Sequence, residues 1–512
     1  MNPVELSIFT NRMNAVCEEM GAVLQRAAFS PNIRDRLDFS CAVFDAQGEL
    51  CAQAAHIPVH LGSMAYAMRD IVTQIEWHAG DMVVVNDPFL GGTHLPDVTL
   101  IAPVFVNDRL AGYVVNRAHH ADIGAHTPGS MPISRTLAEE GIVIPPQFLI
   151  RQGQHNSALM QDILKATRNQ RIGQGDFAAQ ISANKTGVRR LEALISRLGL
   201  NTYQQALVEL NDYGERLART MLSEIPPGEY CFEDYMDDDG LGHTRLPIRL
   251  CLTIRRDKII ADFAGTAAQT EGNINCPLSV AAAAVYYVFR CLMPAQTPAC
   301  AGTFRLITLQ APSGCLLNAQ RPAAVAAGNV ETSMRIVDVV MGALGKALPD
   351  KMPAASHGSM NNLAMGGRYL DQFWDYYETM GGGMGAGPRY PGLAAVQVHM
   401  TNTRNTPIEV LEMNYPLRVR EYGLREGSAG SGLHRGGEGL IREVEFLAPA
   451  TMTLLTERRS LPPWGMREGG AAKPGANWLN GQPLPGKISC EVGTGDVLRV
   501  ETAGGGGWGQ LE

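Results

Sequence analysis

The chain has 512 residues, of which 45% are hydrophobic and 18% are charged, and its net charge is -8 with a pI near 5.9. These values are typical of a globular protein with too much material for one compact core, so we expect two or three lobes. The acidic balance and the lack of a lysine- or arginine-rich run argue against nucleic acid as a partner. No apolar run approaches the length of a membrane span, so we expect no membrane association.

The first 30 residues predict an amphipathic helix. The segment MNPVELSIFTNRMNAVCEEMGAVLQRAAFS lacks the basic start and continuous apolar stretch of a secretory signal. Its apolar residues recur at helical spacing instead, at Val4, Leu6, Ile8, Phe9, Met13, Val16, Met20, Val23 and Leu24.

The ten cysteines occur singly, in apolar contexts such as FSCAVF and YYVFRCLM, and no CxxC pair is present. This pattern predicts neither a disulfide framework nor a cysteine zinc site. We therefore expect a cytoplasmic protein.

Strand-like and helical patterns alternate in the first third of the chain. A turn at residues 45–48 divides two short strands, and a helical patch covers residues 62–76. The run DMVVVNDP indicates a buried strand. TLIAPVFV and LAGYVVNRA indicate two more strands, joined at Asn107–Asp108.

The rest of the chain changes character twice. Residues 176–224 are helical in pattern, residues 230–266 alternate like antiparallel strands, and two further helices are expected at 279–293 and 330–348. From about residue 362 short strands and glycine clusters follow. We predict a multi-lobed α+β fold with an α/β region at 1–175, a helical and mixed α/β region at 176–360, and a β-rich region at 361–512.

Two neighbouring segments concentrate residues that could carry chemistry. NDPFLGGTHLPD, residues 86–97, contains His94 and Asp97 among glycines and prolines, so these side chains are expected on a constrained loop and not on a helix face. NRAHHADIGAHTPGS, residues 116–130, contains His119, His120 and Asp122 where a predicted strand ends.

Three interpretations of these segments are open from the residues alone. Imidazole and carboxylate groups could bind zinc, manganese, iron or cobalt. Asp122 could accept a hydrogen bond from a metal ligand and so orient it. They could also form a catalytic acid/base pair, or a buried polar loop with satisfied hydrogen bonds. Either histidine of the pair could be the one that faces the site, because successive strand side chains point to opposite faces.

No nucleotide-binding or nucleophile motif is convincing. GQPLPGKIS resembles a phosphate loop, but Ile488 stands where the magnesium-binding hydroxyl residue belongs, and two prolines occupy the loop. No GxSxG elbow occurs. If the protein is a hydrolase, we expect it to use activated water and not a side-chain nucleophile.

Six segments, in order along nearly the whole chain, resemble the hydantoinase B/oxoprolinase family. They are NDPFLGGTHLPDVTLIAPVF, NRAHHADIGAHTPGSMP, EEGIVIPP, GNVETSMRIVDVVMGAL, YPLRVREYGLREGSAGSGLHRGGEGLIRE and TAGGGGWG. The resemblance implies a metal-dependent subunit of an ATP-dependent cyclic-amide hydrolase, which opens a hydantoin or lactam ring after its carbonyl oxygen has been phosphorylated. ATP and magnesium would belong to a separate A-type subunit with an actin-like ATPase fold, in a hetero-oligomer such as a heterotetramer.

The resemblance also implies a set of site residues. The metal ligands carried over are Asp38, His94, Asp97 and His119, with His120 as the competing choice for His119. His120 and Asp122 are the candidate catalytic or ligand-orienting residues. Asn86, Asp87 and Arg117 are expected to support the site, and no role is assigned to His126 or His357.

Three alternative functions remain open. The chain could belong to an acetone carboxylase-like ligase, although it is shorter than the corresponding subunits. It could be a non-catalytic scaffold for the ATPase partner, or a metal-dependent hydrolase that needs no ATP. Neither the ring nor the metal can be named from the sequence.

Overall fold

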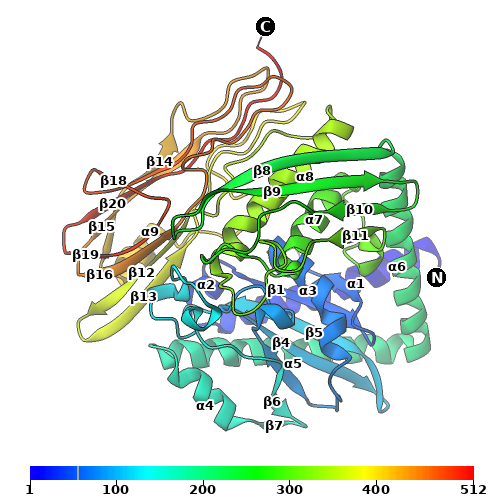
Figure 1. Cartoon of the computed structure of the whole chain (residues 1–512). Helices are drawn as coiled ribbons and strands as arrows, with labels where there is room; N and C mark the ends of the chain where they lie inside the picture. The colour runs from blue at the N-terminus through cyan, green and yellow to red at the C-terminus, as the bar shows by residue number, and fades with distance from the viewer. Residues whose placement is uncertain (55–56, 512) are drawn as a thin grey trace.

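The structure, a computed structural model, describes residues 1–54 and 57–511. Its N-terminal part lies at the bottom in Figure 1, a second sheet with its helices lies above it, and the C-terminal strands extend to the left and top. This is the expected α+β architecture with several lobes. Within the described residues, no helix has the length and apolarity needed to cross a bilayer.

The N-terminal lobe is built on a seven-stranded sheet in the order β2-β1-β5-β4-β3-β6-β7. Its strands are β1 (Phe39–Asp45), β2 (Leu50–Gln53), β3 (Met82–Val85), β4 (Asp97–Val106), β5 (Arg109–His119), β6 (Gln147–Arg151) and β7 (Gln154–His155). Both faces of the sheet are covered. Cys41 and Val43 pack towards α1 and α5, whereas Ala42 and Phe44 pack towards α3. Strands buried on both sides explain the continuous apolar runs in this part of the sequence.

Several helices surround this sheet and connect it to the next lobe. They are α1 (Pro3–Ala27), α2 (Pro31–Arg34), α3 (Pro58–Val72), α4 (Ser157–Lys165), α5 (Gln170–Leu198) and α6 (Leu200–Ser223). The predicted N-terminal helix is confirmed, although Val4 and Ile8 are exposed. Helix α3 begins four residues earlier than the predicted patch, because Pro58 occupies its first turn, where proline is well tolerated.

The middle lobe is a four-stranded sheet in the order β11-β10-β9-β8, with helix α8 packed on β8 and β9 and helix α7 packed against α8. Its strands are β8 (Gly228–Asp238), β9 (Thr244–Ile254), β10 (Ile259–Asp262) and β11 (Ile307–Gln310), and its helices are α7 (Leu278–Leu292) and α8 (Ser333–Ala347). One π-helical segment, Gly328–Thr332, leads into α8. Such segments occur frequently at functional sites.

Cysteines 231 and 251 correct one sequence-based expectation. They form a disulfide across β8 and β9, where they are direct register partners with Cα atoms 4.0 Å apart. The sequence pattern did not predict this pair, because the two residues are 20 positions apart and only the strand register brings them together.

The C-terminal part contains a four-stranded sheet, β13-β12-β16-β19, and a five-stranded sheet, β14-β15-β20-β17-β18. The strands are β12 (Asn362–Tyr369), β13 (Gln372–Glu378), β14 (Leu417–Arg425), β15 (Gly439–Phe446), β16 (Ala450–Leu455), β17 (Ala476–Leu479), β18 (Gln482–Leu484), β19 (Lys487–Val492) and β20 (Val497–Glu501), with one short helix, α9 (Ile408–Asn414). The core of the middle lobe includes side chains from residue 57 to residue 455. The division at residues 175 and 360 stays a prediction.

Candidate metal centre

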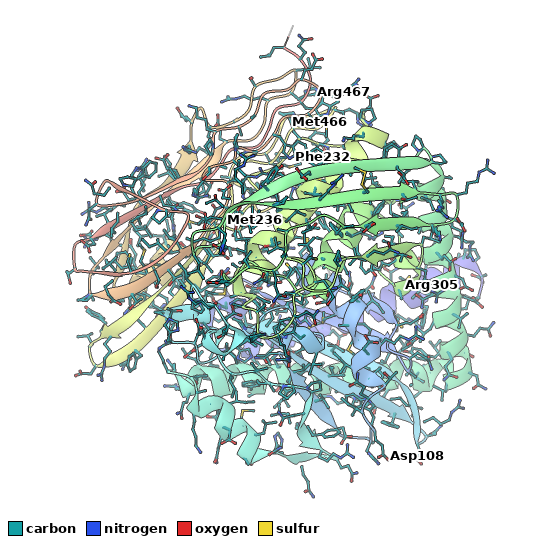
Figure 2. All side chains as sticks on the ribbon, viewed as in Figure 1. Asp108, Phe232, Met236, Arg305, Met466 and Arg467 are labelled. Atoms are coloured by element: carbon teal, nitrogen blue, oxygen red, sulfur yellow. A yellow bond between two sulfur atoms is a disulfide. The ribbon has the colours of Figure 1, made fainter. Side chains whose placement is uncertain are left out.

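Strand register places three candidate ligands side by side at one end of the N-terminal sheet. Asp97 opens β4 and His119 closes β5, and the two are direct partners in the antiparallel ladder. Asp38 immediately precedes β1, and its carbonyl oxygen accepts the backbone N–H of His119 at 3.0 Å. The opposite end of the same hairpin lies at the lower edge of the molecule, where Asp108 occupies the turn (Figure 2).

The loop before β4 brings the fourth candidate. Gly91 has a φ of 104°, a conformation that glycine adopts readily. A Cβ atom on Gly92 would lie 2.4 Å from the carbonyl oxygen of Asn86, so the loop folds tightly on itself. The following bend carries His94 back over the start of β4, three residues before Asp97. The expectation of a constrained loop is therefore confirmed.

These side chains converge on a small volume. The Nε2 atom of His94 lies 3.2 Å from Oδ1 of Asp97, and Nδ1 of His119 lies 3.4 Å from the same oxygen. One potential ligand atom from each of the three residues falls within 4.8 Å of the others. Asp38 lies at the edge of this cluster, with Oδ2 3.8 Å from Nδ1 of His119. Three of the four proposed ligands therefore form one group, and Asp38 lies beside His119 at its edge.

Electrostatics favour a cation at the centre of this cluster. Burial alone would raise the pKa of Asp97, but the neighbouring His60 and His94 outweigh burial and hold that pKa well below its usual range. Burial lowers the pKa of His119. Burial also opposes the charged form of His94, but the charge and hydrogen bond of Asp97, together with the charges of Glu140 and Asp38, raise the pKa of His94. Asp97 Oδ1 and His94 Nε2 are buried and make no hydrogen bond of acceptable geometry. Buried polar atoms without partners are uncommon, and nitrogen and oxygen donors of this kind fit a divalent metal ion.

The second oxygen of Asp97 is held separately. Its Oδ2 atom accepts from the hydroxyl of Thr93 at 2.6 Å and from the side-chain amide of Asn329 at 3.3 Å. His60 Nε2 lies 3.1 Å from the same oxygen. Asp97 is thus fixed so that one oxygen is fully engaged and the other points to His94 and His119.

The sequence reasoning missed both His60 and Asn329. His60 lies in the first turn of α3, on a buried face that is apolar apart from His60 and Ser63, and a histidine on such a face was the available signal. Asn329 lies in the π-helical segment, more than 200 residues from Asp97 in sequence. Only the tertiary structure connects it to this site.

The three supporting residues hold the site loop in place. Asn86 donates from its side-chain amide to the carbonyl oxygens of Leu95 and Ile142. Asp87 accepts from the backbone N–H of Phe89 and pairs with Arg321. Arg117 also donates a hydrogen bond to this loop.

Arg117 reaches the loop from inside the lobe. Its guanidinium donates to the hydroxyls of Thr99 and Ser63 and to the carbonyl oxygen of Gly91. Burial lowers the pKa of Arg117 to about 10. These contacts match the expected supporting role.

His120 and Asp122, the proposed catalytic pair, lie outside the cluster. His120 follows β5 on the opposite side from His119, and its Nε2 atom is 2.9 Å from Oε1 of Gln180. Asp122 accepts from the hydroxyl of Ser130 and from the backbone N–H groups of Gly124 and Arg168. Both residues make structural contacts outside the cluster, and their catalytic role stays a prediction. His126 is exposed, and His357 is buried in another part of the molecule.

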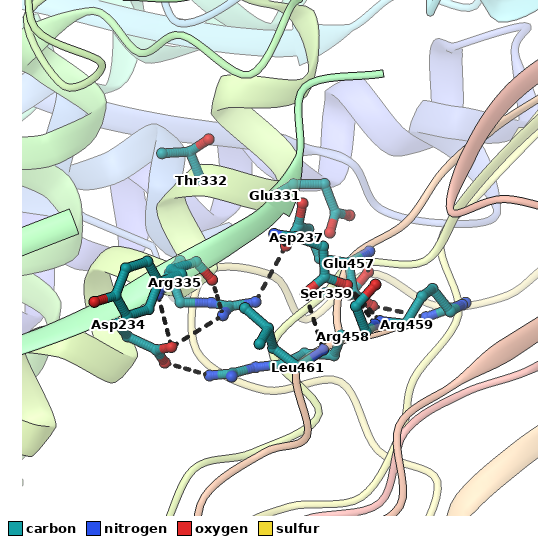
Figure 3. A network of polar contacts seen from close by, with 12 residues as sticks. Asp234, Asp237, Glu331, Thr332, Arg335, Ser359, Glu457, Arg458, Arg459 and Leu461 are labelled. Atoms are coloured by element: carbon teal, nitrogen blue, oxygen red, sulfur yellow. Dashed lines mark hydrogen bonds and ion pairs between the residues drawn. The ribbon is translucent and has the colours of Figure 1, made fainter. Parts of the chain in front are cut away.

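A second buried polar cluster lies between β8, α8 and the C-terminal region (Figure 3). Arg458 pairs with Asp234 at 2.7 Å and with Asp338 at 2.5 Å. Arg335 pairs with Glu457 at 3.2 Å. We refer to Asp234, Asp237, Glu331, Arg335, Asp338, Glu457, Arg458, Arg459 and Lys487 as the arginine network.

Comparisons with known proteins show the family of the chain. The family model described as hydantoinase B/oxoprolinase matches residues 2–511. The chain belongs to the hydantoinase B/oxoprolinase family. It is 40% identical to 5-oxoprolinase 1 of Arabidopsis thaliana over 99% of its own length, but it spans only 42% of that protein. It is 32% identical to a candidate D-/L-hydantoinase subunit of Pseudomonas sp. (strain NS671), and covers 90% of it.

Solved structures extend this relationship. The ATP-dependent caprolactamase from Pseudomonas jessenii superposes with a TM-score of 0.93 at 27% identity, covering 100% of this chain and 91% of the caprolactamase chain. An acetone carboxylase chain shares the fold, with a TM-score of 0.89 at 17% identity, covering 99% of this chain and 76% of the other. The family includes ATP-dependent enzymes acting on cyclic amides, together with relatives that share the fold.

Proposed function

We propose that this chain is the ring-opening component of an ATP-dependent cyclic-amide hydrolase, and that a separate A-type ATPase subunit phosphorylates the carbonyl oxygen of the substrate. The observation that carries the proposal is the buried convergence of His94, Asp97 and His119, in which His94 Nε2 and Asp97 Oδ1 lack hydrogen-bond partners. Whole-chain membership of the hydantoinase B/oxoprolinase family and the similarity to a caprolactamase support the substrate class.

Asp38, His94, Asp97 and His119 would hold the divalent ion, which could be zinc, manganese, iron or cobalt. Two carboxylates and two neutral imidazoles would leave the loaded site with no net charge. When bound, such an ion would act as a Lewis acid and lower the pKa of a bound water toward about 7.

The chain's own residues would keep the site ordered and dry. Tyr377 stacks on the His119 ring with centroids 4.9 Å apart, and the Arg36 guanidinium lies over the Tyr377 ring, 4.8 Å from its centroid. Thr93, His60 and Asn329 contact the Oδ2 atom of Asp97 and so fix its carboxylate. Fixed side chains of this kind orient a reactive centre without reorganisation during the reaction.

The division of labour follows from substrate chemistry. The amide nitrogen is a poor leaving group, and amide resonance weakens the carbonyl as an electrophile. Phosphorylation of the carbonyl oxygen gives an activated imidate. Addition of one water to its carbon gives a tetrahedral species, and the protonated ring nitrogen leaves it as an amine, so that the C–N bond breaks and an acyl phosphate forms. A second water then hydrolyses the acyl phosphate to a carboxylate and inorganic phosphate. The phosphorylation requires a nucleotide site, and the sequence of this chain offers no convincing phosphate loop.

The test is reconstitution with the A-type subunit, followed by a screen of hydantoin, N-methylhydantoin, 5-oxoproline and simple lactams. We expect ring opening and phosphate release that require ATP and both subunits. Ring opening by this chain without ATP would identify an ATP-independent hydrolase instead. A chain that binds the A-type subunit but no stoichiometric metal would be a scaffold, and carboxylation of acetone would place it with the ligases.

A further inference from the structure

A groove of about 470 Å³ lies between the N-terminal lobe and the C-terminal region, and its lining includes His120 but none of the four proposed metal ligands. Helix α2 and the beginning of α5 form one side, and the β12–β13 hairpin and α9 form the other. The hairpin projects from the lower left of the molecule in Figure 1. We call this feature the acidic groove; its polar residues include Asp122, Asp176 and Asp375.

The rim of the acidic groove is unusually apolar for a surface. Large hydrophobic side chains there are exposed by 48% at Phe29, 45% at Tyr369, 79% at Leu370, 48% at Phe373 and 85% at Met413. Three of them lie at the tip of one hairpin, where turns normally carry polar residues. Exposed apolar groups gathered in one place usually mark an interaction surface.

The interior of the acidic groove has more negative than positive charge. Arg168 lies 3.6 Å from Asp122 and 3.7 Å from Asp375, so one guanidinium serves two carboxylates. Asp176 has no exposed surface; its Oδ1 accepts from the backbone N–H groups of Phe29 and Ser30, and its Oδ2 has no partner. Arg34, which lines the acidic groove, is paired with Asp35.

The pKa of Asp375 reflects this excess of negative charge. Burial, reinforced by the charge of Asp122, raises the pKa of Asp375 to about 7 despite the opposing effect of Arg168. A cation brought into the acidic groove would stabilise the ionised form of this carboxyl group.

We propose that the acidic groove is the docking surface for the partner subunit, and that it receives a partner segment with a lysine or arginine flanked by apolar side chains. The apolar rim would pack against the flanking side chains, and the buried carboxylates would pair with the cation. The inference rests on the proposed function, because that function requires a partner.

The lengths of the related proteins support the choice of a partner protein as the occupant of the acidic groove. This chain spans 42% of 5-oxoprolinase 1 and 41% of the Dictyostelium discoideum 5-oxoprolinase, so more than half of each protein lies outside the matching region. The Pseudomonas relative of similar length is named as one subunit of a hydantoinase. In those proteins a second polypeptide region accompanies this one, and a surface of this chain must meet it.

The test compares binding of the purified A-type subunit to the wild-type chain and to single variants by biolayer interferometry. We expect Leu370→Ser and Phe373→Ser each to raise the Kd about 10-fold or more, as the loss of an apolar anchor does. Asp375→Asn should raise the Kd and make binding less sensitive to salt. Val208→Ser is the matched control, because Val208 is 60% exposed on α6 and does not line the acidic groove.

Metal content and thermal unfolding of each variant verify that its fold is intact. Unchanged Kd values for all three groove variants, with tight binding by the wild type, would overturn the docking surface and leave the proposed function standing. Failure of the wild type to bind the A-type subunit would overturn both. If the wild-type chain alone is a dimer that Leu370→Ser converts to a monomer, the occupant is a second copy and the proposal is wrong.

Discussion

The cluster around Asp97 and the arginine network are both buried and rich in carboxylates, but they differ in where the balancing charge comes from. In the arginine network, three arginines and one lysine of the chain itself lie among the acidic groups. Around Asp97 the nearest basic groups are the imidazoles of His60, His94 and His119. A buried carboxylate needs a compensating charge. The arginine network therefore has the features of a structural element, and the Asp97 cluster has those of a site that receives a cation.

The largest expected difference between the two clusters is in metal binding, and a substitution of His94 tests it. We expect His94→Ala to lose the bound metal and all ring-opening activity, because it removes one of the four nitrogen and oxygen donors while the strands that carry the others stay in place. Metal is measured by inductively coupled plasma mass spectrometry on the purified chain. His126→Ala serves as the control, since His126 is exposed and has no contact with the cluster. Full metal content in His94→Ala would show that the ligand assignment is wrong.

Replacing Arg458 should have the converse effect. Arg458→Ala leaves Asp234 and Asp338 buried without their guanidinium, and the loss of one partner of a buried pair lowers the free energy of unfolding by about 3–5 kcal/mol. Metal content per folded chain should not change.

Arg219→Ala is the matched comparison for Arg458, because Arg219 pairs with Glu215 on an exposed face of α6. Exposed pairs contribute less than about 1 kcal/mol. Equal losses of stability for the two variants in urea unfolding would contradict the structural role of the arginine network.

Glu331 gives the arginine network a pH dependence. Burial, reinforced by the charge of Glu457, raises the pKa of Glu331 from 4.5 to about 8 in the folded protein. The folded chain therefore keeps a proton that the unfolded chain loses near 4.5, so this group's contribution to stability falls as the pH rises from about 4.5 to 8. Glu331→Gln, which mimics the protonated form, should remove that fall.

The measurement for Glu331 is urea unfolding of both proteins at about pH 5 and pH 8. Between the two pH values, we expect the free energy of unfolding of the wild type to fall by on the order of 2–4 kcal/mol more than that of the variant. The same pH dependence in both proteins would show that Glu331 is not protonated in the fold.

His60 offers the smallest and most selective change. The hydroxyl of Ser40 accepts the backbone N–H of Ile57, so its own hydrogen is free to donate to Nδ1 of His60, 3.3 Å away. The ring proton of His60 then resides on Nε2, which faces Asp97 Oδ2 at 3.1 Å. We expect His60→Asn, whose amide cannot reach the Nε2 position, to weaken metal binding about 10- to 100-fold.

His60→Gln supplies the comparison for this prediction, since its amide nitrogen can occupy the Nε2 position and should restore most of the affinity. Metal affinity is measured by competition with a chelator. If the asparagine and glutamine variants bind metal equally well, His60 does not act through a hydrogen bond at Nε2.

The sequence predicted the elements of the N-terminal lobe well, because continuous apolar runs and the Asn107–Asp108 turn are local signals. Both turn residues have positive φ, at 50° and 58°, as a tight hairpin turn requires. The four proposed ligands came from the motifs and the family resemblance. The choice of His119 over His120 needed the strand register, which pairs His119 with Asp97. His60, Asn329 and the Cys231–Cys251 disulfide depend on contacts between distant segments, and no local pattern encodes them.

The central claim is that the Asp97 cluster holds a metal ion, and anomalous diffraction tests it most directly. Crystals of the chain purified without chelators are measured on both sides of the absorption edge of the metal found by mass spectrometry. We predict one anomalous peak within coordination distance of His94 Nε2, Asp97 Oδ1 and His119 Nδ1. A fully occupied peak elsewhere, with none at this cluster, would contradict the claim.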